Sequence, residues 1–132
     1  MSASRVAALA ALTSLVAWGA KAVAIWVAGG LDKSPLESPL FLVGLVALVV
    51  AFVALGVSMA RGRSLAVKVI GGAVGLLVGV ALSLLASFLA GAVIPESAGW
   101  VQEEAGLWFS ALLAVGVTAA WRAKQGTARA AV

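Results

Sequence analysis

The sequence contains no cysteine, histidine or tyrosine, and it also lacks asparagine. Without cysteine or histidine the chain has no disulfide, no thiol chemistry, no zinc site of the usual kind and no histidine ligand for haem. It also has no glycine-rich phosphate loop followed by a lysine, and no nucleophile with a suitable base beside it. We therefore expect neither a cofactor nor an enzymatic activity.

Charge is scarce as well. Only 11% of the residues are charged and 64% are hydrophobic, with a mean hydropathy of +1.16. A soluble domain carries roughly 25% charged and 45–50% apolar residues, so the composition predicts a chain whose solvent is lipid. The net charge of +4 does not indicate a nucleic-acid partner, because the basic and acidic residues fall in separate connections. The length predicts a single domain over residues 1–132.

Four apolar segments predict an all-α integral membrane protein with four transmembrane helices and short loops. Crossing a hydrocarbon core takes about 20 helical residues. Glycines at 29 and 30 end the first segment, Ser38 is the expected N-cap of the second, and Pro95 ends the third. The predicted spans are 6–28, 39–60, 65–94 and 105–121.

The first and last segments are the weaker spans. A central lysine costs about 2.5–3.5 kcal/mol on insertion, so Lys21 must lie off-centre or have support from a neighbour. A rival interpretation takes residues 1–24 as a signal peptide cleaved at Ala20-Lys21-Ala22, although the apolar pattern continues to Ala28. Glu103 and Glu104 are expected to begin the fourth helix at the water boundary, with Trp108 and Trp121 as interfacial anchors.

The distribution of charge predicts the orientation. Seven of the nine basic residues fall on one side of the predicted topology, and all five acidic residues fall on the other. Basic loops stay in the cytoplasm, so both termini are expected to be cytoplasmic. The many alanines, valines, leucines and arginines are typical of GC-rich bacterial genomes, which indicates a bacterial plasma membrane. The basic side comprises Arg5, Arg61, Arg63, Lys68, Arg122, Lys124 and Arg129; the acidic side comprises Asp32, Glu37, Glu96, Glu103 and Glu104.

A small residue recurs at every fourth position of the third segment. We call this set the small-residue stripe: Gly71, Gly75, Gly79, Ser83, Ser87 and Gly91. Such a stripe lets two helix backbones approach closely and form hydrogen bonds, and its spacing favours a right-handed crossing. It is a candidate helix-packing interface, either with another helix of this chain or with a second membrane protein.

Lys21 is the one ionisable residue well inside a predicted span. Ser14, Trp18 and Lys21 share one helical face, where the tryptophan could hold a cation–π contact. On one interpretation this face lines a cavity and contacts an anion or a lipid headgroup. On the other, Lys21 extends along the helix towards the outer headgroups, where Asp32 and Glu37 pair with it.

Two functions remain. The first is a non-catalytic structural or accessory subunit of a larger membrane assembly, or a protein that self-associates through the third helix; its partners are the lipid bilayer and other membrane-protein chains. The stripe, the minimal loops and the lack of reactive groups favour it. The alternative is a small oligomeric channel or transporter, or a holin-like pore, with Lys21 facing the pathway.

Overall fold

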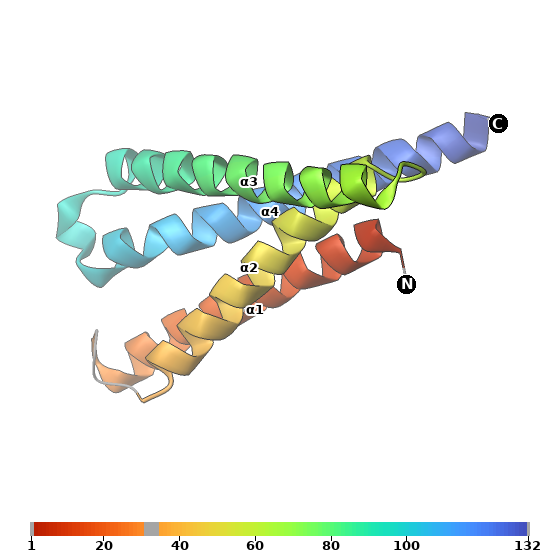
Figure 1. Ribbon diagram of the computed structural model, residues 1–132. Coiled ribbons are helices and arrows are strands. Elements are labelled where there is room, and N and C mark those ends of the chain that lie inside the picture. The colour runs from red at the N-terminus through yellow and green to blue at the C-terminus, as the bar shows by residue number, and fades with distance from the viewer. Residues whose placement is uncertain (1, 31–34, 132) are drawn as a thin grey trace.

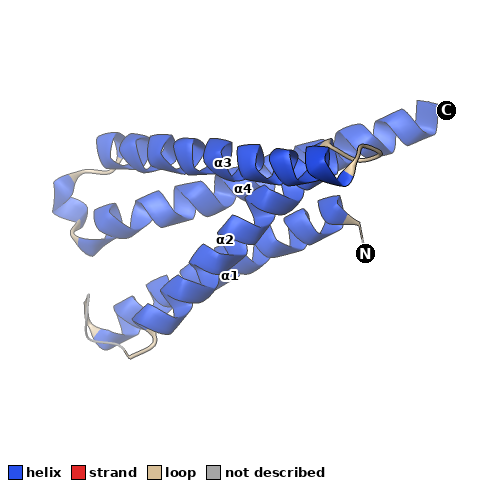
Figure 2. Ribbon diagram, viewed as in Figure 1, coloured by secondary structure: helices blue, strands red, loops and turns tan. Residues whose placement is uncertain are grey.

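The chain is a bundle of four long helices (Figures 1 and 2). The computed structural model describes residues 2–30 and 35–131, with side chains as far as Gly126. Its helices are α1 (Ala3–Ala28), α2 (Glu37–Met59), α3 (Leu65–Val93) and α4 (Trp100–Ala131), with a short 3₁₀ turn, η1 (Glu96–Ala98), before α4. No strand occurs in the described residues. All four helices are long and apolar enough to cross a membrane, as the sequence predicts.

Two predicted helix starts are wrong. Helix α2 begins at Glu37 with Leu36 at the cap position, so Ser38 is inside the helix and is not its N-cap. Helix α4 begins at Trp100, three residues before the predicted start at Glu103, and continues past 121, the predicted end of the span. Both errors have the same cause: the prediction followed apolar residues, whereas helical backbone continues through polar residues at either end of an apolar run.

The ends of α1 and α3 follow the prediction closely. At the end of α1, Gly29 adopts φ 88°, and the N–H of Gly30 donates to the carbonyl of Ile25 at 3.0 Å. A left-handed glycine here turns the chain out of the helix at little steric cost. Helix α3 begins after Ser64, whose hydroxyl accepts from the N–H of Val67, and ends one residue before the predicted boundary.

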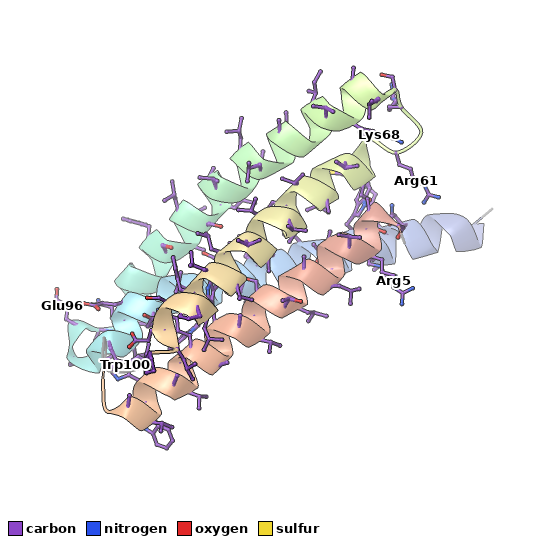
Figure 3. The ribbon with its side chains drawn as sticks, turned by 60° about the horizontal axis from the view of Figure 1, so that its bottom comes forward. Arg5, Arg61, Lys68, Glu96 and Trp100 are labelled. Carbon is purple, nitrogen blue, oxygen red and sulfur yellow. The ribbon has the colours of Figure 1, made fainter. Side chains whose placement is uncertain are left out.

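The helices form a ring in which α1 packs against α2 and α4, and α3 packs against the same two. Figure 1 shows both termini and the turn between α2 and α3 at one end of the bundle, with the other two connections at the opposite end. We call these the basic end and the acidic end. Figure 3 shows Arg5, Arg61 and Lys68 at the basic end, and Glu96 and Trp100 at the acidic end.

The centre of the bundle is built mainly from alanine around two large rings. Trp18 is 1% exposed and Phe52 is 4% exposed, and both belong to one buried cluster. Gly44 of α2 lies directly beneath the Trp18 indole, where an added methyl group would overlap the ring. Alanine and glycine at contacts let helices approach closely, which is the main source of helix association in lipid. The alanines of this cluster are Ala11, Ala51, Ala111 and Ala114.

Candidate functional site

Lys21 of α1 and Glu104 of α4 form a buried ion pair near the acidic end. The Lys21 Nζ lies 2.7 Å from the Glu104 Oε1, and the two residues are 8% and 6% exposed. Asp32 and Glu37 were the predicted partners of an extended lysine. Asp32 lies outside the described residues, and the ion pair that Lys21 forms with Glu104 was not predicted. Glu104 is available because α4 begins at Trp100, which places this carboxylate in the second turn rather than at the helix start.

Lys21 lies beside an aromatic ring, and Glu104 has one carboxylate oxygen without a hydrogen bond in the described chain. The Lys21 Nζ lies 5.6 Å from the centroid of the Phe41 ring, so Phe41 provides the cation–π contact that the sequence assigned to Trp18. The second carboxylate oxygen of Glu104 is buried and has no hydrogen-bond partner among the described residues. Because a lone buried charge is far more costly than a paired one, each member of this pair depends on the other.

The other two residues of the predicted polar face on α1 also bond between helices. The Ser14 hydroxyl donates to the Gly44 carbonyl at 2.8 Å, and the Trp18 Nε1–H donates to the Phe41 carbonyl at 3.2 Å. The Trp18 and Phe41 rings stack with their centroids 6.4 Å apart. The face therefore points into the bundle, where it joins α1 to α2 and, through Lys21, to α4.

A recess of about 350 Å³ opens beside the ion pair. Lys21, Glu37, Ser38, Phe41 and Leu42 line it, and Glu37 is only 8% exposed. The recess offers an ammonium group, a carboxylate and an aromatic face to a small polar ligand. The ammonium group already contacts Glu104, so an anion at this position would compete with that carboxylate.

The first half of the small-residue stripe lies against α2. A methyl group added at Gly71 would sit 2.8 Å from the Gly56 carbonyl oxygen, and one at Gly75 would sit 2.9 Å from the Gly56 Cα. At Gly79 an added methyl group would overlap the Phe52 ring. Backbone meets backbone at this crossing, so the absence of side chains is what permits it.

The second half of the stripe lies against α4. The Ser110 hydroxyl donates to the Gly106 carbonyl at 2.7 Å and lies 3.3 Å from the Ser83 carbonyl oxygen. A methyl group added at Gly106 would sit 2.8 Å from the Ser87 Oγ. Of the glycines in the stripe, only Gly91, near the end of α3, would accept a methyl group with nothing within 4 Å among the described residues. The Gly91 carbonyl accepts from the Gln102 Nε2 of α4 at 3.4 Å, so all six stripe positions make contacts within the chain.

Several contacts were missed by sequence reasoning. Trp121, expected at the membrane interface, donates its Nε1–H to the Ser58 hydroxyl at 2.8 Å and joins α4 to α2. Trp108 lies in the third turn of α4, edge-on to Trp100 with the ring centroids 6.3 Å apart. A partial signal for the ion pair was present in the sequence, since a lysine inside a span is often paired with a counter-charge, but five acidic residues lie on that side and nothing singled out Glu104.

Comparison of the chain with known protein families, with curated proteins and with solved structures gives no match. The ion pair, the stripe and the outer surface of the bundle are therefore the basis for its proposed function.

Proposed function

We propose that the chain is a multi-pass protein of the bacterial plasma membrane, with both termini in the cytoplasm. The support is the separation of charge along the bundle. Arg5, Arg61 and Lys68 lie at one end and Glu96 at the other (Figure 3), and basic segments are retained in the cytoplasm. The basic end is thus the cytoplasmic end.

Cysteine accessibility tests this orientation, because the natural chain has no cysteine. A membrane-impermeant thiol reagent applied to intact cells should label Ser97→Cys and should leave Ser64→Cys and Gly126→Cys unlabelled until the membrane is opened. Labelling of Ser64→Cys before Ser97→Cys would reverse the proposed orientation, and labelling of both would remove the four-span topology.

We further propose that the protein acts as a non-catalytic structural or accessory subunit of a membrane assembly. One observation carries this proposal: three polar side chains, Lys21, Ser14 and Trp121, each bond to another helix of the same chain. Lys21 bonds to Glu104, Ser14 to the Gly44 carbonyl, and Trp121 to Ser58. Groups used in this way hold a fixed bundle, so the protein acts on partners through its outer surface.

Helix α3 is the favoured helix for such contacts. It is the least covered of the four helices in the described chain, with 17% of its apolar window buried against 33–39% for the others. Because most of the stripe faces inward, the surface available to another chain is the opposite face of α3. Its largest exposed side chains there include Leu77, Leu84 and Phe88, which are 70%, 68% and 73% exposed.

Site-specific photo-crosslinking in cells tests the subunit role. A photoreactive residue at Leu77 or Leu84 should give a protein adduct of one defined size, which mass spectrometry after gentle-detergent purification identifies. The matched control is Val16 on α1, which is 70% exposed and should give no such adduct. A monomer that crosslinks to no protein from any of these positions would contradict the subunit role.

The alternative function is a small oligomeric channel or transporter, or a holin-like pore, in which Lys21 faces the pathway. Two observations favour it: the open recess beside Lys21, and the buried Glu104 oxygen that lacks a partner in the described chain. If the protein has this function, proteoliposomes that contain it should show ion or solute flux. The Lys21→Met variant should fold but show no flux. Unchanged flux in a well-folded Lys21→Met variant would exclude it.

A further inference from the structure

An apolar groove runs along the outside of α2 and α3, starting at the basic end. Its volume is about 470 Å³, and we call it the α2–α3 groove. Arg63, two residues before α3 begins, lines one end of it. The remaining lining is apolar and includes Met59, Ile70, Val74, Val78, Leu82 and, from α4, Val117.

The groove results from the glycine crossing between the two helices. Gly56, Gly71 and Gly75 line it at the place where the two backbones touch. The longer side chains on either side stand out from this line, with Met59 56% exposed and Ile70 61% exposed. A depression between two rows of apolar side chains fits a flexible hydrocarbon chain better than it fits a polar ligand.

The groove is longer than the hydrocarbon thickness of one leaflet of a bilayer. Its lining on α3 extends from Val67 to Leu82. Fifteen helical steps rise about 22 Å, whereas half of a hydrocarbon core is about 15 Å thick. An acyl chain that enters from the leaflet at the basic end therefore lies against the protein along its whole length.

The charge at the entrance is positive. Arg63 is exposed, and its guanidinium forms no ion pair with any described residue. The N-terminus of α3 follows directly, and its free N–H groups add partial positive charge. A guanidinium binds a phosphate through two parallel hydrogen bonds, which a lysine ammonium does not reproduce.

We propose that the α2–α3 groove binds an anionic phospholipid, with one acyl chain in the groove and the phosphate on Arg63. A zwitterionic lipid is disfavoured because its ammonium group would lie in the positive field of the same end, to which Arg61 and Lys68 also contribute (Figure 3). This site rests on the proposed membrane placement, since an acyl chain reaches the groove only from a bilayer.

The test uses the full-length protein in phosphatidylcholine vesicles that contain a trace of phospholipid with a photoreactive acyl chain. The probe headgroup is either phosphatidylglycerol or phosphatidylcholine, and mass spectrometry locates the adducts. Phosphatidylglycerol should label the α2–α3 groove several-fold more than phosphatidylcholine. Arg63→Gln should lower that labelling about five-fold to ten-fold, the effect of losing one charge-assisted hydrogen-bonding group.

Two matched controls separate the site from general attraction to a charged surface. Arg61→Gln removes the same charge from the same turn, but Arg61 lines a separate recess with Lys68, so groove labelling should change less than two-fold. Val74→Trp, inside the groove, should exclude the acyl chain, whereas Val69→Trp, which is 63% exposed and does not line the groove, should not.

Two results would each overturn the lipid site: equal labelling of the groove by both headgroups, or an equal loss of labelling in the two arginine variants. Flotation with the vesicles and resistance to an alkaline wash are measured on the same samples. Failure to float overturns the membrane placement itself; a protein that floats without selective labelling overturns only the lipid site.

Discussion

Near the acidic end, α1 joins its neighbours through polar side chains, whereas nearer the basic end α2 and α3 meet backbone to backbone. The first region contains the Lys21–Glu104 ion pair at 2.7 Å, and towards the middle the Ser14 bond to the Gly44 carbonyl at 2.8 Å. The second contains Gly56, Gly71 and Gly75, where an added methyl group would collide with the facing helix. The hydrophobic effect does not drive helices together in lipid. The first region is therefore stabilised by polar contacts between side chains, and the second by close packing of the two backbones.

The difference lies in what each region tolerates. A polar contact depends on two particular atoms, so removing one of them leaves a buried partner that has lost its bond. A glycine contact depends on empty volume, so adding any atom forces the backbones apart. The first region should therefore be sensitive to deletion and the second to addition.

The largest effect is expected at the ion pair. Lys21→Met should lower the free energy of unfolding by about 3–5 kcal/mol, because Glu104 is then left as an uncompensated buried charge. This expectation replaces the near-zero effect that an extended lysine would give. Thermal unfolding in detergent, monitored by circular dichroism, provides the measurement.

The double variant Lys21→Met/Glu104→Met is the control for the ion pair. With both charges removed, the protein should recover most of the loss, because replacing a buried pair by apolar residues is often neutral or stabilising. If the single variant is as stable as the natural protein, the polar region does not depend on this pair and the comparison fails.

Smaller changes in the free energy of unfolding are expected along the stripe, and they should differ in sign between Gly75 and Gly91. Gly75→Ala should cost about 1–3 kcal/mol, because the new methyl group would lie 2.5 Å from the Phe52 carbonyl oxygen. Gly91→Ala should instead stabilise by about 0.5–1 kcal/mol, since nothing lies within 4 Å among the described residues and alanine favours the helix. Equal effects of the two variants on unfolding would mean that the glycine crossing does not hold α3 to α2.

The smallest effect is expected for a single neutral hydrogen bond. Ser14→Ala should cost about 0.6–2 kcal/mol, because the hydroxyl of Ser14 joins two helices. Thr13→Ala is the matched control: its hydroxyl bonds to the Leu9 carbonyl of its own helix at 2.8 Å and is exposed. The Thr13→Ala variant should keep nearly the same free energy of unfolding as the natural protein in this assay. If Thr13→Ala is destabilised more than Ser14→Ala, hydrogen bonds between helices do not stabilise this bundle more than bonds within a helix.

Much of the architecture could be predicted from the sequence because it depends on runs of apolar residues. The four helices follow from the length of those runs, and the end of α1 follows from Gly29 and Gly30. The inward orientation of the polar face on α1 could also be anticipated, since Ser14, Trp18 and Lys21 share a helical face.

The partners of those residues could not be predicted in the same way. Pairing of Lys21 with Glu104 joins two residues that are 83 positions apart, and nothing in either local pattern specifies the other. Likewise, the spacing of the stripe could not show which helix would face it. The α2–α3 groove depends on the exact crossing of two helices, which no single helix encodes.

The long separation between Lys21 and Glu104 also has a consequence for synthesis. In the proposed topology α1 leaves the ribosome before α4, with 83 residues between the two partners. At about 5–20 residues per second this interval is roughly 4–17 s. During that time α1 holds a lysine without this counter-charge, so we expect its insertion to be less favourable than in the finished bundle. Once α4 is in place, Glu104 supplies the counter-charge of Lys21, so a chain truncated before α4 should leave α1 less stably inserted.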